Sequence, residues 1–88
     1  MKANRAYRLI VRRGGWAPAF MAEAGRTDRV EIVEVDTGEV ALFWDLEARR
    51  AARLARALKT DLVQLEADAF ITAWRDASER HGARGRSG

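Results

Sequence analysis

The chain has 88 residues, with 16 Lys and Arg, 13 Asp and Glu and a formal net charge of +3. This length holds one domain with a small core, and the lack of cysteine excludes disulfides and thiolate chemistry. The apolar run Leu9-Ile10-Val11 is too short for a signal peptide or a membrane span. We therefore expect one cytoplasmic domain over residues 1–81, with no membrane contact.

The first predicted element is a strand near the N-terminus. Tyr7, Leu9 and Val11 alternate with Arg8, Ile10 and Arg12, which is the period of a half-buried strand. Gly14-Gly15 then suits a two-residue hairpin turn, because both positions of that turn need positive φ. The pattern favours a return strand over 16–24, and an irregular loop over 14–25 is the alternative.

A second hairpin is predicted over residues 29–45. Strands at 29–36 and 39–45 are joined by Thr37-Gly38, a strong hairpin signal. If Gly38 is a left-handed bulge residue, one sheet face is cleanly apolar, with Val30, Ile32, Val40, Leu42 and Trp44. The opposite face then carries Val33, Val35 and Phe43. A plain two-residue turn would instead place Glu31 beside Trp44.

The remainder is predicted to be helical. Asp45 can cap a helix over 46–59, and Asp61 with Gln64 three residues on suggests a second helix start. One long bent helix is the alternative. The apolar stripe of the second helix contains Val63, Ala67, Phe70, Trp74 and Ala77. We expect the second helix to end at Gly82, and residues 82–88 to form a disordered basic tail.

These elements predict an α+β fold. It is an antiparallel β-meander of three or four strands followed by two C-terminal helices packed on one sheet face. No catalytic site, metal site or cofactor is predicted. His81, the only histidine, lies near Ser78 at a helix end where nothing holds it toward the hydroxyl. The acidic residues around the second hairpin lack the spacing of a calcium loop, so we interpret them as its solvated tip; they are Glu31, Glu34, Asp36 and Glu39. We therefore expect neither an enzyme nor a small-molecule substrate.

Two functions fit this pattern. The first is a protein-interaction module that forms a homodimer, because two helices cannot cover both faces of such a sheet. Its candidate self-association face is Val33, Val35 and Phe43, and Trp16 is a candidate exposed contact anchor for a protein partner.

The alternative is nucleic-acid binding without sequence preference. Candidate phosphate contacts are Arg8 and Arg12 on the first strand and Arg49, Arg53 and Arg56 on the first helix. The favoured interpretation of the helical row is simply the solvated side of an amphipathic helix. The alternative gains support if both rows face the same way.

Overall fold

The computed structural model describes residues 1–13 and 27–80. It contains a three-stranded antiparallel sheet in the order β1-β2-β3, followed by two helices. The expected strand over 16–24, with Trp16, and the expected tail over 82–88 lie outside the described residues. The elements are α1 (Ala3–Ala6), β1 (Tyr7–Arg12), β2 (Thr27–Glu34), β3 (Val40–Glu47), α3 (Ala48–Gln64) and α4 (Ala67–Arg80).

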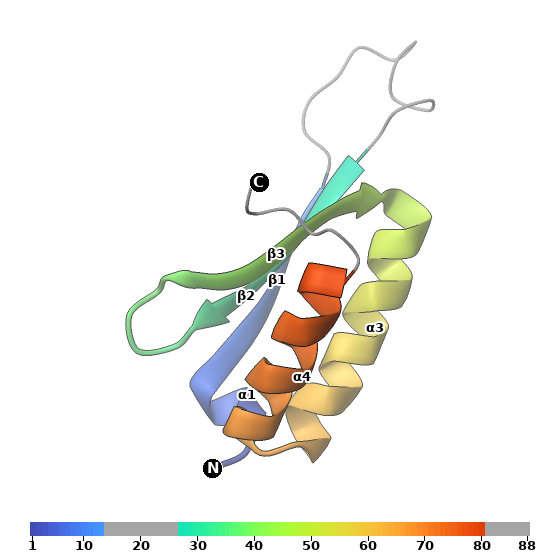
Figure 1. The fold of residues 1–88 in the computed structure, drawn as a ribbon. Helices are drawn as coiled ribbons and strands as arrows, with labels where there is room; N and C mark the ends of the chain where they lie inside the picture. Colours follow the sequence, from blue (N-terminus) through green and yellow to red (C-terminus); the bar gives the residue numbers. More distant parts are fainter. Residues whose placement is uncertain (14–26, 81–88) are drawn as a thin grey trace, which may run out of the picture.

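The predicted fold class is confirmed. Both long helices pack against one face of the sheet (Figure 1). β1 pairs directly with β2 along its whole length, from Tyr7 opposite Glu34 to Arg12 opposite Arg29. β1 and β2 are therefore neighbours in the sheet.

The β2–β3 hairpin keeps the predicted face, with one correction. Gly38 has a φ of 78° and its N–H donates to the Glu34 carbonyl at 2.8 Å, so it is the left-handed turn residue. Ile32 lies opposite Leu42, so these two residues share one face, as expected. A further irregularity follows, because Val33 pairs with Val40 and Ala41 is left as an extra residue. The prediction that Val40 faces the core is therefore wrong.

The predicted start of the first helix is wrong as well. β3 runs on to Glu47, because Asp45 pairs with Arg29 and Leu46 with Asp28 in the ladder. Asp45 therefore cannot cap the helix, and α3 begins at Ala48. Strand pairing here outweighs the capping preference of an aspartate.

Residues 48–80 form two helices, but these do not divide at Asp61. The break lies at Leu65 and Glu66, where the N-terminal segment pairs with the corner. The Ala3 N–H donates to the Leu65 carbonyl, and the Ala67 N–H donates to the Met1 carbonyl, both at 2.9 Å. These bonds satisfy polar groups that helix ends leave unpaired. The short helix α1, which the sequence pattern did not predict, thus holds the α3–α4 corner (Figure 1).

The core lies between the sheet and the helices. Its largest fully buried side chains are Phe70, Ile32, Leu58 and Val30. Phe70 confirms the predicted α4 stripe, but Val63 is 61% exposed on α3 and is not core. Buried members of the core are Ala3, Val30, Ile32, Leu42, Trp44, Ala51, Leu58, Leu62 and Phe70.

Two aromatic contacts join the layers. The rings of Tyr7 on β1 and Phe70 on α4 lie 5.8 Å apart, and Trp74 meets Trp44 edge-on at 6.1 Å. The Trp74 indole N–H also donates to the Asp61 carboxylate at 3.0 Å. Asp61 therefore links α3 to α4, in place of the capping role that was predicted for it.

Candidate interaction surface

The sheet face turned away from α3 and α4 is the main candidate surface. Strand alternation places the core residues Val30, Ile32 and Trp44 toward the helices and the intervening residues outward. No helix or strand among residues 1–13 and 27–80 packs on this outer side. We call it the open face, and its residues are Arg8, Ile10, Arg12, Arg29, Glu31, Val33, Val40, Phe43 and Asp45.

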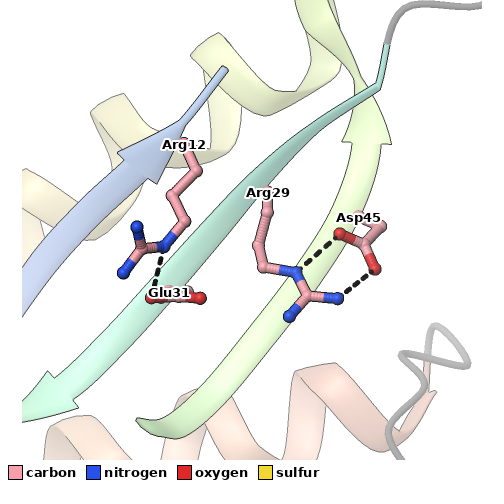
Figure 2. Close-up of polar contacts among 4 residues, drawn as sticks. All are labelled: Arg12, Arg29, Glu31 and Asp45. Carbon is pink, nitrogen blue, oxygen red and sulfur yellow. Dashed lines mark hydrogen bonds and ion pairs between the residues drawn. The ribbon is translucent and has the colours of Figure 1, made fainter. Parts of the chain in front are cut away.

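A bidentate ion pair joins β2 to β3 on the open face. Arg29 lies directly opposite Asp45 in the strand register. Its Nε and Nη2 atoms donate to the two carboxylate oxygens at 2.9 and 3.1 Å (Figure 2). Hydrogen bonding to Asp45 raises the pKa of Arg29 above its ordinary value. The Arg29 Cζ atom also lies 4.4 Å from the centroid of the Phe43 ring, a cation–π contact.

A second ion pair joins β1 to β2. The Arg12 Nε donates to Glu31 Oε1 at 3.2 Å, along a diagonal of the register (Figure 2). The two partners differ in environment, because the Arg12 side chain is 63% exposed and that of Glu31 is 6% exposed. Glu31 lies between Ile10 and Phe43, its direct cross-strand neighbours. A buried carboxylate is costly unless it is paired, so Arg12 stabilises Glu31 there.

The structure brings together part of the predicted self-association set. Val33 and Phe43 lie half-buried on the open face. Val35 lies beyond the end of β2, in the turn, where it is 44% exposed and its N–H donates to the Ala6 carbonyl. Val40, which was predicted for the core, is 48% exposed opposite Val33 and extends the apolar part of the face. Trp16 lies outside the described residues.

The two predicted arginine rows face in opposite directions. Arg8 and Arg12 belong to the open face of the sheet. The three arginines of α3 are exposed and turn away from the buried Ala51 and Leu58, and the last of them lies toward the flank of the helix that adjoins Val11 of β1. These are Arg49, Arg53 and Arg56. One flat surface of a partner therefore cannot contact both rows together.

Sequence reasoning missed the charged network of the open face. Glu31 was interpreted as part of a solvated hairpin tip and Asp45 as a helix cap, while Arg29 received no role. The partner of each acid lies on a neighbouring strand, so the pairs become evident only from the β1–β2 and β2–β3 registers. The one signal in the sequence is an acid, Glu31, directly between the apolar residues Val30 and Ile32, because a carboxylate buried there needs a cation nearby.

Within residues 1–13 and 27–80, no group of three His, Cys, Asp or Glu side chains could hold a metal ion. None of the helices in the described part of the chain is long and apolar enough to cross a membrane. Comparisons with protein-family models, with curated proteins and with solved structures found no match to this chain.

Proposed function

We propose that this protein is a non-enzymatic interaction module that self-associates through the open face. The observation that carries the proposal is a sheet face with Ile10, Val33, Val40 and Phe43 on it and no described element over it. A second copy related by a two-fold axis is the simplest cover for such a face. Two sheets would then pack face to face, about 10 Å apart.

The charges of the open face favour its burial in this way. Arg29 already pairs with Asp45, and Arg12 with Glu31, within one protomer. A paired charge gives up less hydration on burial than a free one, because its partner replaces some of the lost water contacts. The apolar side chains beside these pairs then supply the favourable free energy of association. The ion pairs fix orientation more than they add affinity.

The size of the open face limits how tight the dimer is. Three strands about 4.8 Å apart with six paired residues at about 3.4 Å cover roughly 300 Å² in projection. A standard interface buries about 800 Å² on each partner. We therefore expect a weak dimer, with a dissociation constant on the order of 10 µM.

The test replaces one apolar residue of the open face by lysine. Val40 is 48% exposed, so Val40→Lys leaves the core intact. In a dimer, the new ammonium group would be buried in the interface without a partner, which costs several kcal/mol. Val63→Lys is the matched control, because Val63 is 61% exposed on α3, away from the open face. Circular dichroism checks that both variants fold.

We expect Val40→Lys to be monomeric at concentrations where the wild-type protein and Val63→Lys form dimers. Light scattering at about 100 µM, well above the expected dissociation constant, measures the mass of all three. A Val40→Lys variant that dimerises like the wild type would exclude the open face as the interface. Dimers lost equally in both variants would show that added charge alone separates the copies.

Binding of nucleic acid without sequence preference is the alternative function, and it has less support. Arg8 and Arg12 face away from the α3 row, and Arg12 is already paired with Glu31. Only Arg49, Arg53 and Arg56 remain as one exposed row, so few phosphates can be neutralised at once. Fluorescence anisotropy with a single-stranded oligonucleotide at 50 and 200 mM salt tests this alternative.

A cytoplasmic location, which the sequence analysis expected, is also part of the proposal.

A further inference from the structure

A groove of about 580 Å³ lies beside α3, on the other side of the sheet from the open face. The residues from α3 recur every three or four positions, so they form one flank of that helix. Most of them are alanines, and their small side chains leave the space open. The groove is lined by Val11, Arg13, Asp28, Ala48, Ala52, Ala55, Arg56 and Lys59.

The shape of the groove selects a narrow ligand. From Ala48 to Lys59 the helix rises about 16 Å, so the groove is elongated. The groove therefore suits one extended chain of atoms, and its volume is in the range of small-molecule sites.

The charges of the groove differ between its two ends. Arg13 and Asp28 come from the adjoining ends of β1 and β2 and have opposite signs. Arg56 and Lys59 lie farther along α3, and neither forms an ion pair with any described residue. The end at Arg13 and Asp28 is therefore close to neutral, and the end at Arg56 and Lys59 carries two cations that could pair with an anion.

The floor between these ends is apolar. Val11 is 39% exposed, and Ala52 is exposed on the flank of α3 beside it. An aliphatic body lying on Val11 and the alanines would bury this surface from water. The floor thus complements an apolar chain, while the α3 end complements its charged head.

We propose that this groove binds a narrow amphipathic anion. Its aliphatic body lies along Val11 and the three alanines, and its phosphate or carboxylate head lies beside Arg56 and Lys59. Binding involves no covalent step. The site is separate from the open face, so it stands or falls independently of self-association.

The test is a calorimetric titration of the full chain with hexyl phosphate, and with octanoate to separate phosphate from carboxylate recognition. Two variants change the groove. Ala52→Phe fills it with a ring, and because Ala52 is exposed the core is undisturbed. Arg56→Ala with Lys59→Ala removes the two cations. The matched control, Arg49→Ala with Arg53→Ala, removes the same charge from the outward side of the same helix.

We expect hexyl phosphate to bind the wild-type protein and the control alike. Loss of the two groove cations should weaken binding about tenfold, because both are near the surface and partly screened. Ala52→Phe should abolish binding, while circular dichroism and the solution mass stay unchanged. Binding of octanoate but not hexyl phosphate would assign the site to carboxylates, and the reverse result to phosphates; either supports the proposal.

Three results would overturn the proposal that the groove binds an amphipathic anion. The first is that neither probe binds the wild-type protein at millimolar concentration. The second is equal weakening in the control and the groove-cation variant, which would indicate general attraction to a basic helix. The third is inorganic phosphate binding as tightly as hexyl phosphate, since the apolar floor would then have no role.

Discussion

The hydrogen bond between Trp74 and Asp61 offers a sharp test of how α4 is held on α3. Its donor is the indole N–H and its acceptor is a carboxylate oxygen, 3.0 Å away. Such bonds to a charged group contribute about 1.5–3 kcal/mol, and the lower end applies here because both side chains are only half-buried. We therefore expect a coupling free energy of about 1.5 kcal/mol between the two side chains.

The stability of the single variant Asp61→Ala should not by itself reveal this coupling. Asp61 lies in the last turn of α3, where alanine is about 0.5 kcal/mol better as a helix former. Loss of a negative charge at a helix C-terminus gains roughly another 0.5 kcal/mol. These gains offset most of the lost hydrogen bond, so the single variant should be only about 0.5 kcal/mol less stable than the wild type. In a Trp74→Phe background, where the bond is already absent, Asp61→Ala should stabilise the protein by about 1 kcal/mol.

The assay is urea denaturation of the four proteins of this double-mutant cycle. Thermal melts give a second readout, since 1 kcal/mol corresponds to about 4–8 °C in a domain of this size. Asp61→Asn keeps an acceptor oxygen and serves as the control for loss of charge alone. If Asp61→Ala changes stability equally in both backgrounds, the two side chains are not coupled and the account of the α3–α4 contact is wrong.

Three further predictions concern the core, a turn and the α3–α4 corner. Phe70→Ala should destabilise the protein by about 3–5 kcal/mol in urea denaturation, because Phe70 is fully buried. The exposed control Val63→Ala should change stability by less than about 0.5 kcal/mol. Similar losses of stability in the two variants would place the core elsewhere. Gly38→Ala should lower the free energy of unfolding by about 1 kcal/mol in the same assay, because Gly38 has a φ of 78°. Nothing lies near the added methyl group, so the loss comes from the backbone alone. A stabilised variant would rule out the left-handed turn. The hydrogen bond from the N-terminal ammonium group holds the pKa of Glu66 below its ordinary value of 4.5. The contribution of Glu66 to the free energy of unfolding is therefore present above that pH and is lost as the pH falls through the lowered folded-state pKa. The difference in stability between the wild type and Glu66→Gln should disappear on acidification, and a difference that grows would contradict the assignment.

Much of the fold could be predicted from the sequence because its local signals agree. Alternation in residues 7–12 and the glycine at 38 are sufficient for the strands and the turn. Four of the five predicted core positions of β2 and β3 follow once Gly38 is taken as left-handed, and Val40 is the exception. The signals that failed were single polar residues. Asp45 and Asp61 both resemble helix caps, but each has a partner on a distant element that local sequence does not reveal.

The candidate site was harder to predict, for the same physical reason. Val33 and Phe43 were found because side-chain alternation assigns them to one face. The bulge at Ala41, which brings Val40 to that face, has no signal in the sequence. The ion pairs depend on strand register, and the groove beside α3 depends on how one alanine flank meets the end of β1. These features come from packing between elements, which periodicity within an element does not specify.

The most direct test of the central claim is the mass of the unmodified protein in solution as a function of concentration. Sedimentation equilibrium should report the 9.9 kDa monomer at low micromolar concentration. The average mass should then rise toward twice that value at a few hundred micromolar, as a dissociation constant on the order of 10 µM requires. A mass that stays at 9.9 kDa across this whole range would contradict self-association through the open face.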